Sequence, residues 1–105
     1  MVNCRHVTTT LPDKVGAEEL AARVIAERLG ACAQVVGPVS STYRWQGEIR
    51  QSTEWFCHLK TTAARLPALM DRIRSLHPYE VPEIIAVSID DADPDYLRWV
   101  ESEVR

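Results

Sequence analysis

A two-residue turn in the middle of the chain, Gln46-Gly47, separates two long extended stretches, and no other feature restricts the fold as much. Residues 31–45 and 48–61 are rich in β-branched and aromatic side chains, which favour strands. Glycine accepts the positive φ that a two-residue hairpin turn needs. At ~3.3 Å per residue, the first stretch would reach about 46 Å from Cys32, whereas a compact domain of this size is roughly 33 Å across. We therefore expect either a bend at Gly37-Pro38 or an overhanging hairpin that other copies of the chain cover.

Helical and strand patterns flank this hairpin on both sides. Before it, the pattern predicts a strand over 3–10 and a helix over 17–29 that Asp13 caps and Gly30 ends. After it, the pattern predicts a second helix that Thr62 opens, whose regular part begins near Leu66 and ends at His77-Pro78. A strand over 83–89, buried on both faces, and a helix up to Val104 capped by Asp93-Pro94 complete the chain. This order predicts one α+β domain over residues 1–105. It is a ferredoxin-like βαββαβ fold with a long central hairpin and a short C-terminal helix.

Composition excludes several classes of protein. The formal net charge is −3 and the basic residues are scattered among acids, so we expect no nucleic-acid partner. The apolar runs are far shorter than the roughly 20 residues that span a bilayer, and residues 1–6 lack the pattern of a signal peptide. We therefore expect a cytoplasmic protein without a membrane partner. The three widely spaced cysteines predict reduced thiols and no disulfide.

The densest group of ionisable side chains lies in residues 77–83, between two prolines. His77 ends the second helix, where the helix dipole favours a protonated imidazole. Tyr79, Glu80 and Glu83 follow in a loop that the prolines stiffen. Imidazole and carboxylate groups suit metal ligation or proton transfer. The structural alternative is a helix stop with a capping histidine.

Other candidates are more scattered. Trp45, with Tyr43 two residues earlier, could form a ligand platform, although we favour packing between subunits. Lys60 could attract an anionic ligand, although we favour a solvated lysine there. His6 and His58 lie in strands that the fold places side by side, and the sequence favours satisfied core or interface histidines there rather than metal ligands.

The chain lacks the motifs of common catalytic sites. It contains no G-x-S-x-G, H-E-x-x-H, G-x-G-x-x-G or Walker-type loop. These absences argue against the enzyme classes that such motifs mark, and our leading hypothesis is a protein that is not an enzyme. A lower-ranked hypothesis is an enzyme that uses His77 as acid or base and Glu83 as its partner.

Several blocks of sequence together resemble the CutA divalent-cation tolerance family. The blocks follow in order along nearly the whole chain, and they are residues 8–13 (TTTLPD), 27–32 (ERLGAC), 41–48 (STYRWQGE), 60–62 (KTT), 77–86 (HPYEVPEIIA) and 96–99 (YLRW). The resemblance implies a ferredoxin-like homotrimer, similar in build to PII-type signalling proteins. It also implies a role in tolerance to copper and other divalent cations, without established catalysis.

The resemblance also bears on candidate ligands. Some bacterial members have a cysteine on the first strand and two adjacent histidines before Pro-Tyr, and these are associated with copper. The corresponding positions here are Thr9, Leu76 and His77. Our leading hypothesis is a trimer that binds divalent Cu or Zn through His77, with Cys32, Glu80 or Glu83, because this set suits Cu(II) or Zn(II) better than soft Cu(I). The alternative is a PII-like sensor that binds a small anionic metabolite in clefts between subunits through Trp45, Lys60 and Tyr79.

Overall fold

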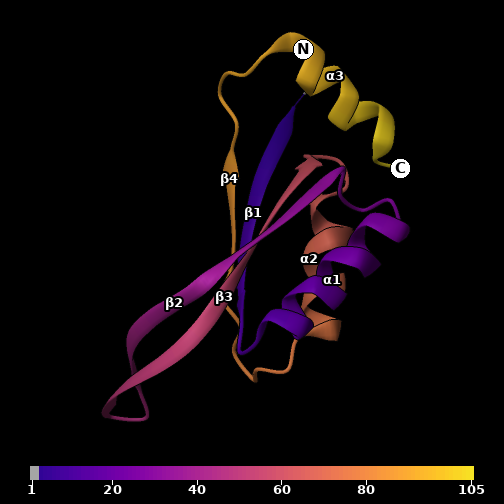
Figure 1. The fold of residues 1–105 in the computed structure, drawn as a ribbon. Helices are drawn as coiled ribbons and strands as arrows, with labels where there is room; N and C mark the ends of the chain where they lie inside the picture. Colours follow the sequence, from indigo (N-terminus) through magenta and orange to yellow (C-terminus); the bar gives the residue numbers. More distant parts are fainter. Residues whose placement is uncertain (1–2) are drawn as a thin grey trace.

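The structure is a computed structural model that describes residues 3–105, and its elements follow the predicted order (Figure 1). They are β1 (Cys4–Leu11), α1 (Lys14–Ala26), β2 (Cys32–Trp45), β3 (Glu48–Thr62), α2 (Leu66–Leu76), β4 (Ile84–Ser88) and α3 (Pro94–Glu103). The carboxylates of Asp13 and Asp93 accept hydrogen bonds from the backbone N–H groups of Gly16 and Tyr96, so both predicted caps are confirmed. The α+β fold with an added C-terminal helix is confirmed as well.

The strands form one antiparallel sheet in the order β2-β3-β1-β4. Helices α1 and α2 cover one face of this sheet (Figure 1), where Val7, Leu59 and Leu69 are completely buried. Side chains of paired residues share a face of the sheet. The pairing therefore defines a second face, which we call the open sheet face, that carries His6, Thr8, Val36, Phe56, His58, Ile85 and Val87.

The prediction that the last strand is buried on both faces is wrong. Ile84 and Ala86 of β4 pack against the core, whereas Ile85 and Val87 are 51% and 53% exposed. The physical reason is that β4 forms one edge of the sheet, and α1 and α2 cover only one of its faces. Some of the apolar side chains of this strand therefore form an exposed surface in the single chain.

The first helix also ends earlier than predicted. It stops at Ala26, and Arg28 rather than Gly30 follows the cap with a positive φ of 59°. The N–H of Arg28 bonds to the carbonyl of Ile25, and the N–H of Leu29 bonds to that of Val24. These two bonds form a Schellman motif, which satisfies the last carbonyls of the helix without a glycine.

The central hairpin both bends and overhangs. The pairing of β2 with β3 runs to Trp45 and Glu48 at the tip, but β1 pairs with β3 only as far as Trp55. The outer part of the hairpin therefore projects from the domain, whose extents are 45 × 26 × 22 Å (Figure 1).

The bend and the turn of the hairpin both depend on glycine. The register shifts between Val36 and Val39, and a Cβ at Gly37 would lie 2.6 Å from the ring of Trp55, so a glycine is required there. The predicted turn is confirmed, with φ values of 50° at Gln46 and 80° at Gly47.

Candidate functional site

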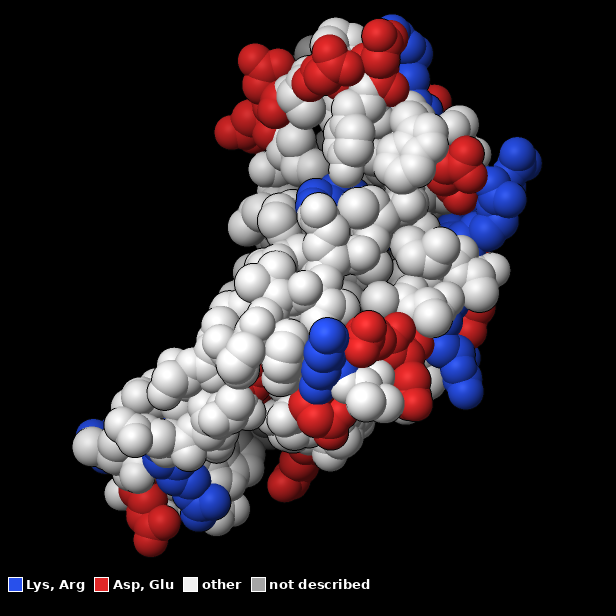
Figure 2. All heavy atoms as spheres, in the orientation of Figure 1, with Lys and Arg blue, Asp and Glu red and all other residues white. Residues whose placement is uncertain are grey.

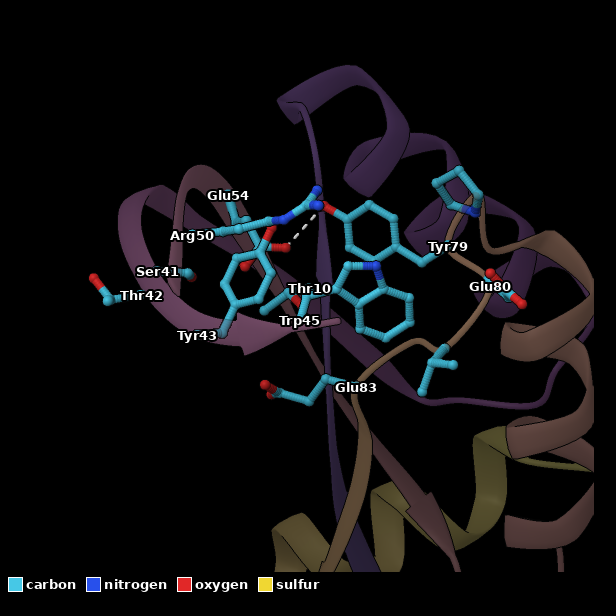
Figure 3. A pocket seen from close by; sticks show the side chains of 12 residues that line it. Thr10, Ser41, Thr42, Tyr43, Trp45, Arg50, Glu54, Tyr79, Glu80 and Glu83 are labelled. Carbon is cyan, nitrogen blue, oxygen red and sulfur yellow. Dashed lines mark hydrogen bonds between the residues drawn. The ribbon is translucent and has the colours of Figure 1, made fainter. Parts of the chain in front are cut away.

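An open pocket of about 650 Å³ lies between the hairpin and the loop that joins α2 to β4 (Figure 3). Its lining comes from Thr10 of β1, from Ser41, Thr42, Tyr43 and Trp45 of β2, from Arg50 and Glu54 of β3, and from Pro78, Tyr79, Glu80, Val81 and Glu83 of the loop. The pocket thus joins the two segments that the sequence singled out, the tip of the hairpin and the proline-flanked loop.

His77 anchors this loop to the sheet. Its Nε2 lies 2.7 Å from the carbonyl oxygen of Thr10, and its Nδ1 lies 3.2 Å from the backbone nitrogen of Tyr79. A carbonyl only accepts and a backbone N–H only donates, so the ring is neutral with its proton on Nε2. Both ring nitrogens are therefore occupied within the chain.

The protonated form that the helix C-terminus favours is not the form that dominates in the structure. Burial lowers the pKa of His77, and the hydrogen bond to Thr10 and the charge of Glu54 only partly oppose this decrease. Desolvation disfavours the charged imidazole more strongly than the nearby dipoles and charges favour it. His77 therefore acts chiefly as a structural anchor in the single chain.

A second link crosses the pocket from the loop to the hairpin. The hydroxyl of Tyr79 donates to Oε2 of Glu54 at 2.8 Å, and Glu54 is only 8% exposed (Figure 3). Burial, together with this bond to Glu54, raises the pKa of Tyr79. The phenol is thus held protonated, and it satisfies a largely buried carboxylate.

The pocket is acidic and aromatic. Three carboxylates, those of Glu54, Glu80 and Glu83, line it together with a single guanidinium, that of Arg50. The rings of Tyr43, Trp45 and Tyr79 line it as well (Figure 3). Such a lining attracts cations more than anions, because the local charge is negative.

The structure brings only some of the predicted site residues together. Trp45, Tyr79, Glu80 and Glu83 line the pocket, and His77 lies beside it.

Cys32 and Lys60 are located elsewhere. They pair with each other across β2 and β3, and the Lys60 amine donates to Gln34 Oε1 at 2.8 Å. Lys60 lies six positions along β3 from Glu54, which is about 20 Å at ~3.4 Å per residue.

The predicted ligands do not form a complete metal site in one chain. Within residues 3–105, no group of three or more His, Cys, Asp or Glu side chains lies close enough to hold an ion. Thr9 faces the helices, completely buried beside Cys57, and in the described part of the chain its hydroxyl has no hydrogen-bond partner. Leu76 packs against the same core. The two positions that correspond to copper-associated residues in the resembled family therefore supply no ligand here.

Two pocket residues escaped the sequence analysis. Arg50 and Glu54 lie on β3 outside the motifs that the sequence singled out, so their residue types alone gave no signal. The turn at Gln46-Gly47 did contain a signal for Arg50. Counting outward from this turn pairs Arg50 with Tyr43, and the structure has the same pair. The same counting pairs Glu54 with Val39, but it cannot show that Glu54 meets Tyr79 of the distant loop.

Comparison with known proteins places these features in context. Residues 5–103 match the family model described as CutA1 divalent ion tolerance protein. The chain is 40% identical over 99 residues to the divalent-cation tolerance protein CutA of Salmonella newport, an alignment that covers 94% of this chain and 86% of that protein.

Solved structures agree with this match. The divalent cation tolerance protein (Cut A1) from Thermus thermophilus is 37% identical with a TM-score of 0.94, over 97% of this chain and 99% of that one. A protein described as the periplasmic divalent cation tolerance protein CutA from Archaeoglobus fulgidus is 27% identical with a TM-score of 0.93, over 97% and 99% of the two chains. Among residues 3–105 of the present chain, no helix is both long and apolar enough to cross a membrane.

Proposed function

The chain belongs to the CutA1 divalent ion tolerance family, and we propose on that premise that it serves tolerance to divalent cations, copper among them, by binding them as a homotrimer without catalysing a reaction. The observation that carries this proposal is the charge of the pocket. Three carboxylates against one guanidinium favour a divalent cation over an anionic metabolite.

The cation ligands that we propose are Glu80 and Glu83, with His77 and Cys32 as further donors. Both glutamates are exposed and line the pocket, so their oxygens are free to bind. His77 joins them when its Nδ1 exchanges the N–H of Tyr79 for the ion. Cys32 lies at the other end of the sheet in its own chain, so it joins only from a neighbouring copy. Mixed carboxylate and imidazole donors suit Cu(II) or Zn(II).

Assembly into a homotrimer is supported by the surfaces that the single chain leaves uncovered. Ile49 on the hairpin is 69% exposed, and Val36, Ile85 and Val87 on the open sheet face are each more than half exposed. Figure 2 shows acidic side chains gathered at α3 and the loop before it. The surface along the middle of β2 and β3 is largely uncharged, and charged side chains of both signs return at the tip. Exposed apolar surface and unpaired strand edges of this kind usually mark an interface.

A cytoplasmic location is part of the same proposal. Cys4, Cys32 and Cys57 are all free thiols in the structure, and free thiols persist in reducing compartments. No nucleic acid or membrane enters the proposed role.

The alternative, a sensor for a small anionic metabolite, has less support. Trp45 and Tyr79 do share the pocket with Arg50, but Lys60 lies outside it. The three carboxylates would repel an anion. We therefore rank this function second.

Thermal unfolding with ligands tests the proposal. Zn²⁺ or Cu²⁺ at about 100 times its dissociation constant should add about 2.7 kcal/mol to the stability, whereas nucleotides should add little. Replacing both pocket glutamates, Glu80→Gln with Glu83→Gln, should reduce the metal effect. Glu18→Gln with Glu19→Gln makes the same change of charge on the exposed side of α1, and it should leave the effect intact.

The opposite results would refute the proposal. Equal stabilisation of the pocket variant and the wild type by metals would exclude the pocket as the cation site. Stabilisation by nucleotides alone would favour the sensor.

Light scattering should give three times the chain mass of 11.9 kDa.

A further inference from the structure

Two of the three histidines meet on the open sheet face, outside the pocket. His6 of β1 and His58 of β3 are diagonal neighbours, because His6 pairs with Lys60 and Thr8 pairs with His58. Nε2 of His6 lies 3.3 Å from Nδ1 of His58, and the two rings are nearly perpendicular, with an interplanar angle of 87°. Both side chains are half-buried.

The distance between the two nitrogens fits a shared metal ion as well as a long hydrogen bond. Hydrogen bonds from N–H groups usually span about 2.7–3.2 Å, so the contact at 3.3 Å is a weak one. Two nitrogens bound to one tetrahedral ion at about 2.0–2.1 Å lie roughly 3.3–3.4 Å apart. The rings are therefore already spaced as two imidazole ligands of a tetrahedral ion would be.

The surroundings of His6 favour the form that a metal requires, which is the neutral imidazole. Burial lowers the pKa of His6, and the charges of Lys60 and His58 lower it further. The amine of Lys60 is itself held by Gln34 Oε1 at 2.8 Å.

The ring of His58 is held in place by two neighbours. It stacks on Phe56 with centroids 5.3 Å apart, and Thr8 Oγ1 lies 3.1 Å from its Nδ1. An ion at Nδ1 therefore meets a ring that Phe56 already orients, and it displaces the hydroxyl of Thr8 from that nitrogen.

We propose that His6 and His58 form a second cation site, in which Nε2 of His6 and Nδ1 of His58 bind one borderline divalent ion, Zn²⁺ or Cu²⁺. On binding, each neutral ring carries its remaining proton on the other nitrogen, so the neutral pair releases no proton. Two imidazoles are half of a tetrahedral set. Water completes this set, or the same pair of another copy does so when the open sheet face is packed in the proposed assembly.

This site is independent of the pocket, because it shares no ligand with it. Its failure and the failure of the proposed function are therefore separate results. Loss of binding in the pocket variant alone would support the pocket and refute the histidine pair, whereas loss in the histidine variants alone would support the pair and refute the pocket as a cation site.

Calorimetric titration of the whole chain with Zn²⁺ at pH 7.5 tests the site. His6→Gln and His58→Gln should each weaken one binding step at least tenfold, since even the loss of partners around a ligand costs about 10–100-fold in affinity. Glu18→Gln with Glu19→Gln, on the exposed side of α1, is the control and should leave that step unchanged. Unchanged binding by both His6→Gln and His58→Gln would overturn the proposal.

A measurement on the unaltered protein avoids the problem of a variant that folds poorly. The imidazole ¹⁵N resonances of only three histidines need to be assigned. Zn²⁺ should shift the resonances of His6 Nε2 and His58 Nδ1 together, in proportion to the occupancy of the site. A shift confined to His77, or none at all, would show that the pair is an ordinary hydrogen-bonded contact.

Discussion

Removal of the hydroxyl of Tyr79 should destabilise the protein measurably, because that hydroxyl satisfies Glu54. The bond is 2.8 Å long and Glu54 is 8% exposed, so water replaces the lost donor poorly. Hydrogen bonds to charged groups contribute about 1.5–3 kcal/mol. We expect Tyr79→Phe to cost about 2 kcal/mol, at the lower part of this range because Tyr79 itself is only half-buried.

Urea unfolding at one fixed protein concentration measures this cost. With a slope of about 1–3 kcal/mol/M, the midpoint should fall by roughly 1 M. Tyr43→Phe is the matched control, because its hydroxyl bonds to Ser52 at an exposed site of the same hairpin and at the same 2.8 Å distance. We expect it to change the stability by less than about 0.5 kcal/mol.

A double-mutant cycle with Glu54→Gln isolates the bond itself. Contacting residues in one network show coupling of about 0.5–3 kcal/mol, and we expect a value above 1. If Tyr79→Phe costs no more than Tyr43→Phe and the coupling to Glu54 is zero, then the link does not hold the loop to the hairpin, and the reasoning about the pocket fails.

Four further predictions follow from the same structure. Because the pKa of His77 is lowered on folding, the contribution of the neutral imidazole to stability is complete above the unfolded pKa of about 6.5 and is lost as the pH falls below that value. Thermal melts between pH 7.5 and 5 should therefore show a smaller loss of stability for His77→Gln than for the wild type. Trp45→Ala should lower the mass measured by light scattering if the indole packs between copies, and leave it unchanged if the indole serves a ligand. Gly37→Ala should cost about 1–3 kcal/mol, because its Cβ would overlap the ring of Trp55; an unchanged urea midpoint would contradict this. Thermal unfolding with and without a reductant should coincide, since the three thiols are free, and a large loss on reduction would contradict the prediction.

Much of the fold could be predicted because its signals are local. The caps at Asp13 and Asp93 and the turn at Gln46-Gly47 each depend on residues a few positions apart, so the sequence alone identifies them. The predicted end of α1 failed for a related reason. Glycine is favoured after a helix because its backbone adopts a positive φ without strain, and this preference can be seen in the sequence. Here Arg28 adopts the same positive φ, because the surrounding hydrogen bonds are satisfied.

The candidate site was only half predictable. The chemistry of Tyr79, Glu80 and Glu83 suggested a binding loop, and the structure places all three in one pocket with Trp45. The same residue types suggested Lys60 and Cys32, which the strand pairing places about 20 Å from Glu54. Residue type indicates what a side chain can do, but not what it faces.

The sequence by itself determined the order of the elements, the length of the hairpin and the position of its turn, because periodicity and turn chemistry act over short distances along the chain. Only the tertiary structure decided which distant side chains meet. Tyr79 and Glu54 are 25 residues apart, and His6 and His58 are 52 apart. The contact between the two histidines depends on the register of β1 and β3, and a one-residue change in that register would turn one of them to the opposite face of the sheet. The contact between Tyr79 and Glu54 depends on where the loop after α2 meets the hairpin.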